Sequence, residues 1–168
     1  AASLVSYVFL YTPLKRRTTV ATLVGAIPGA LPMMAGWTAT GRPLELGAWV
    51  IFAIMFLWQI PHFLALAWLY REDYRAGGLV MLPVDDEDGV QTARQCFNYT
   101  AGLVPVSLLP SVLGLTGIIY FGGALLLGLA FLWVNYNVVR GWTRERARKL
   151  FFASITYLPL LFLLMLFD

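Results

Sequence analysis

Three groups of side chains in this sequence could take part in chemistry, and each lies beside strongly apolar sequence. His62 stands inside a long apolar stretch, directly after Pro61. Asp73 follows the same stretch, within the charged segment Arg71-Glu72-Asp73-Tyr74-Arg75. Lys15-Arg16-Arg17 is a run of three cations. Carboxylates bind Mg²⁺, arginines bind phosphate groups, and histidine can bind a metal or move a proton. These residue types predict a site for a metal ion and a phosphorylated substrate.

Asp73 differs from the other acidic residues of its loop. Acidic residues beside a membrane are usually only solvated, and we expect this of Asp85–Asp88. Asp73 instead follows the apolar stretch without a spacer and is flanked by arginines. A carboxylate at the end of a membrane span can hold Mg²⁺ through its oxygens. Gly77-Gly78 would let the backbone turn tightly, and Met81-Leu82-Pro83-Val84 would return the chain to apolar surroundings.

The run Lys15-Arg16-Arg17 has two possible roles. It can anchor the chain at the lipid headgroups of the cytoplasmic face, and by sequence alone this role is favoured. It can also clamp a diphosphate, because arginine forms bidentate bonds to phosphate and lysine supplies a compact charge. In the second case a diphosphate would lie between this run and Asp73, bridged by Mg²⁺.

His62 is a functional candidate because ionisable side chains inside a membrane span are costly to bury. Trp58 lies one helical turn before it, and Asp73 lies about three turns after it. If the helix continues, all three residues share a face, and His62 and Asp73 are separated by a rise of roughly 16 Å. That face would border a tall cavity suited to a long substrate with a charged head. The alternative is that His62 only hydrogen bonds to a neighbouring helix.

The composition indicates that these residues are positioned by membrane helices. Hydrophobic residues make up 60% of the 168 residues and charged residues only 12%, whereas a soluble domain has about 25% charged residues. Long continuous apolar runs predict an all-α fold, a polytopic transmembrane helical bundle. The single Cys96 excludes a disulfide framework and a Cys-based zinc site. The basic residues form no groove-reading element, so no nucleic-acid partner is expected.

Hydropathy predicts five complete spans after a short apolar segment, Ala1–Tyr11. A crossing needs about 20 residues, so this segment is too short and we expect it to be the end of a helix. We therefore expect the chain to be part of a longer protein. The predicted complete spans are Thr19–Ala39, Gly47–Tyr70, Cys96–Leu115, Ile118–Val138 and Leu150–Phe167.

The first complete span has an unusual pattern of small residues. Ala21, Gly25 and Gly29 recur at four-residue intervals, which is typical of helices that pack closely in membranes. Pro28 and Pro32 remove backbone donors and should bend this helix.

Basic residues alternate sharply between the loops. Eleven of the twelve lie in loops 12–18, 71–95 and 139–149, and the intervening loops hold only Arg42. The positive-inside rule predicts that those three loops are cytoplasmic.

Four segments, in this order and spacing, resemble the UbiA prenyltransferase superfamily, and within it the enzymes that farnesylate heme. They are YTPLKRRT (11–18), WQIPHF (58–63), YREDY (70–74) and MLPV (81–84). The resemblance runs over essentially the whole chain. It implies a nine-helix membrane protein with two Asp-bearing motifs, the second of which lies in this chain. Residues 1–168 would be a single membrane domain, the C-terminal part of the enzyme, with no separate soluble domain and inactive on its own.

The resemblance also implies roles for individual residues. Asp73 falls on the second Asp-bearing motif, although Gly77 stands where the wider superfamily has a further Asp. Ile60 and Val80 replace prolines of the usual pattern. The implied catalytic residues are Asp73, Lys15 and Arg16, with Asp73 also the metal ligand, and the implied substrate-binding residues are Tyr11, Arg17, Trp58, His62 and Tyr74.

The implied reaction joins the farnesyl group of farnesyl diphosphate to the 2-vinyl group of heme b, and water addition then gives heme o. Mg²⁺ is the implied cofactor, and heme b is a substrate. The implied surroundings are the bilayer of a bacterial inner membrane, with a heme A synthase acting downstream. Whether Arg16 and Arg17 hold the diphosphate or the heme propionates stays open.

Two other functions are compatible with the sequence. One is a UbiA-type transferase with an aromatic acceptor, although a small phenol has no need of His62. The other is a non-catalytic transporter or assembly subunit, which would carry polar residues at mid-membrane on several helices. In this sequence the charged residues instead lie mainly in the loops predicted on one side of the membrane.

Overall fold

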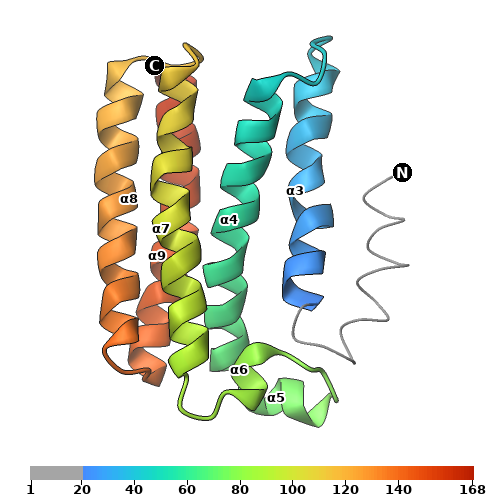
Figure 1. The fold of residues 1–168 in the computed structure, drawn as a ribbon, viewed down its shortest axis with the longest axis vertical. Helices are drawn as coiled ribbons and strands as arrows, with labels where there is room; N and C mark the ends of the chain where they lie inside the picture. The colour runs from blue at the N-terminus through green and yellow to red at the C-terminus, as the bar shows by residue number, and fades with distance from the viewer. Residues whose placement is uncertain (1–20) are drawn as a thin grey trace.

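The computed structural model describes residues 21–168, which form helices and connecting loops without a strand in that range. This confirms the predicted all-α fold class. Two short helices, α5 (Arg71–Ala76) and α6 (Leu82–Asp85), lie across one end of a bundle of long helices (Figure 1). The long helices are α3 (Ala21–Ala39), α4 (Leu46–Leu69), α7 (Val90–Val112), α8 (Ile118–Val139) and α9 (Arg144–Phe167).

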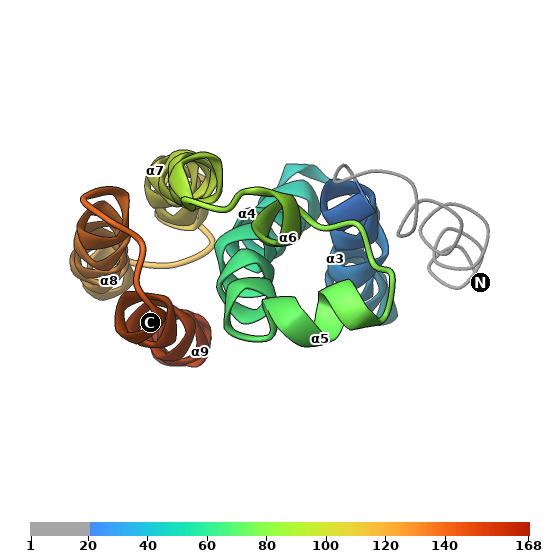
Figure 2. The same cartoon turned by 90° about the horizontal axis from the view of Figure 1, so that it is seen from below.

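Helix α4 occupies the centre of the bundle. It contacts α3, α7 and α9, while α8 packs against α7 and α9 on the far side. Seen from the end that carries α5 and α6, α3 lies on one side of α4, and α7, α8 and α9 lie on the other (Figure 2). One face of α4 therefore borders α3, and the opposite face borders α7 and α9. Residues on the two faces of α4 have different neighbours.

The prediction of five complete spans is not confirmed. Within the described residues, α4, α8 and α9 are long and apolar enough to cross a membrane. The described part of α3, Ala21–Ala39, contains Pro28 and Pro32 and is not among these three helices. Helix α7 begins at Val90, earlier than predicted, and its first turns carry polar residues that hydropathy does not detect. Helix α9 also begins earlier, at Arg144, because the Thr143 hydroxyl caps it by accepting a bond from the Arg146 N–H.

Helix α3 packs against α4 through small residues, among them Gly29 of the stripe that the sequence predicted. Ala26 and Ala30 are the residues of α3 that are almost fully buried. Of the predicted stripe, Gly29 lies so close to the Gln59 side chain of α4 that a Cβ there would collide with it. The surface of α3 that faces its neighbours therefore includes Gly29 together with Ala26 and Ala30. The absence of a side chain at Gly29 makes room for Gln59.

The loop before α7 is more ordered than a solvated acidic loop. Asp86 is buried, and its carboxylate accepts bonds from the Thr92 N–H at 2.6 Å and the Thr92 hydroxyl at 2.7 Å. The expectation that Asp85–Asp88 is simply solvated is thus wrong for Asp86, which ties the loop to the first turns of α7. Asp88 also binds the first turn, through the Val90 N–H at 3.0 Å.

Gly89 fastens this loop to the connection between α8 and α9. Its φ of +72° lies in the left-handed region that favours glycine. A Cβ at this position would lie 2.7 Å from Trp142 and 2.9 Å from Trp68. The two tryptophan rings pack at 5.0 Å between centroids. Three segments far apart in sequence are therefore held together at the α5/α6 end of the bundle.

Candidate functional site

Asp73 lies on α5, which is a separate helix from the one that carries His62. Helix α4 ends at Leu69, and Tyr70 has φ −113° and ψ 25°, outside the helical region. The charged residues that follow leave the bundle and stay at its surface, because burying them without partners would be costly. The prediction that one continuous helix places Asp73 and His62 on a shared face is therefore wrong.

Within residues 21–168, the Asp73 carboxylate has no ion-pair partner. The flanking arginines pair with Glu72 instead, Arg75 at 2.9 Å and Arg71 at 3.3 Å. Arg75 also donates to the Val84 carbonyl at 3.0 Å. Asp73 is exposed, and its side chain makes no ion pair with any residue from 21 onwards. The arginines thus fix α5 and α6, and within the described residues they do not pair with Asp73.

The donor set around Asp73 fits a metal only together with a substrate. In the part of the chain that the structure describes, no three His, Cys, Asp or Glu residues converge on one position. Mg²⁺ is commonly bound by one or two carboxylates together with substrate phosphates. One exposed carboxylate at the end of a membrane bundle can serve as such a ligand to a metal–diphosphate complex.

The chain after α5 returns to the bundle as predicted. Gly78 has a φ of +65°, and the Leu79 N–H closes the turn on the Tyr74 carbonyl at 3.0 Å. Pro83 and Val84 of α6 are buried. Tyr74 is half-buried on α5, beside Asp73.

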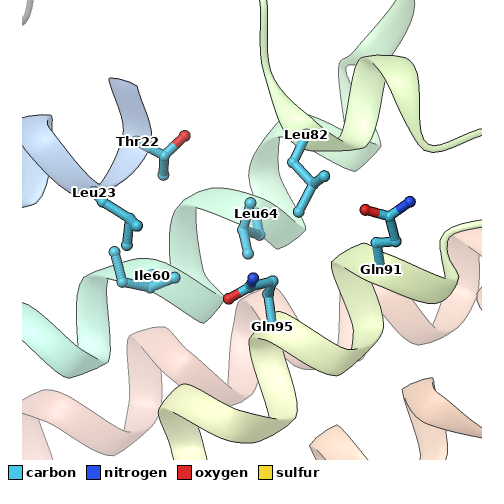
Figure 3. Close-up of a pocket in the computed structure, with 7 residues that line it drawn as sticks. All are labelled: Thr22, Leu23, Ile60, Leu64, Leu82, Gln91 and Gln95. Carbon is cyan, nitrogen blue, oxygen red and sulfur yellow. The ribbon is translucent and has the colours of Figure 1, made fainter. Parts of the chain in front are cut away.

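A cavity of about 210 Å³ lies under α6, at the same end of the bundle as Asp73. Gln91 and Gln95, one turn apart on α7, project their amides into it (Figure 3). Sequence reasoning missed both residues, although glutamines in the first turns of an otherwise apolar helix were a usable signal. The other lining residues are Thr22, Leu23, Ile60, Leu64 and Leu82.

His62 faces the other way, towards α9. Its Nδ1 lies 2.8 Å from the Ser154 hydroxyl, and the Trp58 indole N–H donates to the Ser154 carbonyl at 2.7 Å. The imidazole is stacked between Trp58 at 4.8 Å and Phe151 at 5.0 Å. The predicted shared face of Trp58 and His62 is confirmed. That face borders α9, so the hydrogen bond to a neighbouring helix is present, and His62 does not line the cavity under α6.

Ser154 determines the tautomer of His62. The Ser154 hydroxyl lies 2.6 Å from the Phe151 carbonyl oxygen, which can only accept. Both hydrogen bonds are satisfied when the hydroxyl donates to that carbonyl and accepts from a protonated Nδ1 of His62. The lone pair of the neutral ring is then on Nε2. Sequence reasoning did not identify Ser154, because a serine in an apolar helix gives no signal of its partner.

The other predicted site residues lie outside the described residues. These are Tyr11, Lys15, Arg16 and Arg17, together with the Ala1–Tyr11 segment and loop 12–18.

Comparison with known proteins shows a single, consistent relationship. The UbiA prenyltransferase family matches residues 1–163. A protein named protoheme IX farnesyltransferase from Solibacter usitatus (strain Ellin6076) is 52% identical over 168 residues, covering 100% of this chain and 58% of the relative. Proteins of the same name from Salinibacter ruber and Koribacter versatilis are 48% and 45% identical, covering 96% and 98% of this chain and 57% and 55% of the relatives. The chain thus spans little more than half the length of these relatives. No solved structure matches.

Proposed function

The chain belongs to the UbiA prenyltransferase family, and from this premise we propose that the full-length protein transfers the farnesyl group of farnesyl diphosphate to heme b. The observation that carries the proposal is the 52% identity, over the whole chain, to a protein named protoheme IX farnesyltransferase. The exposed Asp73 carboxylate at one end of an apolar bundle supports it, because a prenyl diphosphate has a charged head and a long apolar tail.

In the proposed reaction, a carbon–carbon bond forms between C1 of the farnesyl group and the terminal carbon of the 2-vinyl group. The bond between C1 and the diphosphate oxygen breaks, and the electron pair leaves with diphosphate. The cation left beside the porphyrin ring takes up water and loses a proton, which gives the hydroxyethylfarnesyl group of heme o. Apolar walls protect the allylic cation from earlier capture by water.

The residues at the α5/α6 end would stabilise the departing diphosphate. Asp73 would hold Mg²⁺, which neutralises charge on the leaving group when bound. Lys15 and Arg16 would donate to the diphosphate oxygens, with Tyr11 and Arg17 beside them. Tyr74 would contact the same head group from α5. Trp58 and His62 would act on the heme side of the reaction.

We further propose the bacterial inner membrane as the location, with the α5/α6 end in the cytoplasm and a heme A synthase as the enzyme that uses the product. The basic residues of loops 71–95 and 139–149 support this orientation.

Replacing Asp73 tests the proposal. Asp73→Ala in the full-length protein should lower prenyl transfer by roughly 100-fold or more, the scale seen when one charge-stabilising group is removed. Membrane insertion should be unchanged, because α5 buries none of its residues. The measurement is product formation by mass spectrometry from farnesyl diphosphate and heme b.

Asp85→Ala is the matched control, since Asp85 is an exposed carboxylate of the same loop. Wild-type activity of Asp73→Ala at saturating Mg²⁺ would remove Asp73 from the mechanism. A prenylated aromatic acid as product, with no prenylated heme, would instead identify an aromatic acceptor. Absence of any prenylated product would favour a non-catalytic role.

A further inference from the structure

A second and larger cavity, of about 610 Å³, lies between α4 and α9. Its volume is within the range of about 300–1,000 Å³ that is usual for small-molecule sites. Helix α4 contributes Leu66 and Leu69, and Tyr70 follows directly after it. Helix α9 contributes Arg148, Phe151 and Phe152, together with Arg144 at its first turn. Tyr70 and Phe152 are each more than half exposed, so flat aromatic surface is available there. Two cations therefore stand beside an apolar and aromatic wall.

The cations of this cavity have no anionic partner in the described part of the chain. Glu145 also lines the cavity, but Lys149 pairs with it at 2.8 Å. Arg144 and Arg148 form no ion pair with residues 21–168. Arg148 lies over the Phe152 ring at 5.7 Å. Guanidinium groups bind carboxylates through two parallel hydrogen bonds. The cavity is thus suited to a flat apolar ligand with acidic groups at one edge.

The cavity lies close to His62 and to the helix that carries Asp73. Phe151 lines it and also stacks on His62, so His62 lies one aromatic layer behind the wall. Tyr70 lines it and directly precedes α5, which carries Asp73. The cavity under α6 lies elsewhere on α4, where Ile60 and Leu64 face it.

We propose that the cavity between α4 and α9 binds the heme acceptor, with its two propionates on Arg144 and Arg148 and its macrocycle against Leu66, Phe151 and Phe152. The inference rests on the proposed function, because it names the place of that reaction's second substrate. The propionates and the 2-vinyl group lie on opposite edges of the porphyrin. Holding the acidic edge at the two arginines therefore turns the reacting edge away from them.

The test compares heme b with its dimethyl ester, in which both carboxylates are blocked. Binding is measured by absorption titration of the full-length protein in nanodiscs of zwitterionic lipid. Arg144→Gln and Arg148→Gln should each weaken heme binding roughly 10- to 100-fold, as expected for the loss of a charge-assisted contact. In the wild type the ester should bind more weakly than heme. In the double variant, heme and ester should bind equally.

Arg140→Gln is the control, because Arg140 is an exposed cation near the same end that does not line the cavity. Its preference for heme over the ester should match that of the wild type, and farnesyl diphosphate binding should be unchanged in all variants. A double variant that keeps the wild-type preference for heme would overturn the inference. The inference would also be overturned if the Arg144 and Arg148 variants bound heme normally but no longer bound added anionic lipid, because the two arginines would then be ligands of lipid headgroups. Failure of the wild type to form farnesylated heme would instead count against the proposed function, since the binding comparison does not depend on turnover.

Discussion

Ser154 has a larger influence on His62 than its size suggests. Its hydroxyl lies within hydrogen-bond distance of both the Phe151 carbonyl and His62 Nδ1, and both bonds form when Nδ1 carries the proton. Trp58 and Phe151 hold the imidazole from both faces. A neutral ring with a lone pair on Nε2 can ligate iron or accept a hydrogen bond. The hydrogen bond to α9 therefore does not exclude a role for His62 in catalysis; it defines which nitrogen could have one.

Substitution of His62 separates a functional role from a purely structural one. His62→Ala in the full-length protein should change the heme absorption spectrum or lower heme affinity, and should leave farnesyl diphosphate affinity unchanged. The physical reason is that His62 stacks on Phe151, which lines the cavity between α4 and α9. The measurement is a heme titration followed by absorbance.

Ser154→Ala is the companion variant for this test. It keeps the imidazole but removes its partner, so heme affinity should fall less than in His62→Ala. Thermal stability should also fall by about 1–3 kcal/mol, because Nδ1 is left without an acceptor. An unchanged heme spectrum and affinity in His62→Ala, with only a lower melting temperature, would show that the residue is structural.

The helices could be predicted where charge marks both of their ends. The span predicted at Gly47–Tyr70 corresponds closely to α4, because Glu45 and Arg71 bound its apolar run. The starts of α7 and α9 could not be predicted from hydropathy, since their first turns are polar and are ordered by hydrogen bonds to Asp86 and Thr143. The helices that pack on the two faces of α4 could not be predicted either, because these tertiary contacts leave no local pattern in the sequence.

The candidate site was predictable only in part for the same reason. Asp73 could be singled out because a carboxylate directly after a span is unusual. The structure places it at the end of the bundle, as its position in the sequence indicated. Its separation from His62 was not visible, because the helical period of the sequence does not reveal the break at Tyr70. The Gln91–Gln95 pair and Ser154 gain their meaning only from the neighbouring helices.

The junction at Gly89 should be sensitive to one added methyl group. Gly89→Ala would be strained by about 1–2 kcal/mol at positive φ, and would also push against Trp142 and Trp68. Gly114→Ala is the control, because it has φ +69° but nothing within 4 Å of the new atom. Thermal unfolding of the full-length protein in detergent should show a clearly larger loss for Gly89→Ala. Equal losses in the two variants would mean that the tryptophan contacts do not matter.

At the scale of the whole molecule, the basic residues from position 21 onwards lie at one end of the bundle, except for Arg42. The connections from α4 to α7 and from α8 to α9 lie at one end, and the connection from α3 to α4 lies at the other (Figure 1). Arg71, Arg75 and Arg94 belong to the first end, as do the cations from Arg140 to Lys149. Arg42 belongs to the second and pairs with Glu45 at 3.7 Å. The alternation predicted from the sequence therefore corresponds to the two ends of the folded bundle.

Cysteine labelling would test the proposed orientation. The native Cys96 is fully buried, so it should contribute little background. Thr40→Cys should react with a membrane-impermeant maleimide added outside spheroplasts, and Glu87→Cys should react only after permeabilisation, since both positions are exposed. The reversed pattern of labelling would contradict the cytoplasmic placement of the α5/α6 end.

Helix α5 buries none of its residues and is held by arginine contacts and by α6. Its own packing therefore contributes little free energy to keeping it folded, and its local opening should be far easier than that of the bundle. The carboxylate proposed to receive the metal and diphosphate thus stands on a helix that has no buried residue. Part of the intrinsic attraction for those ions must offset the entropy lost when this helix is immobilised. The measured affinity for the metal and the diphosphate therefore depends on the cost of ordering α5 as well as on the charge of Asp73.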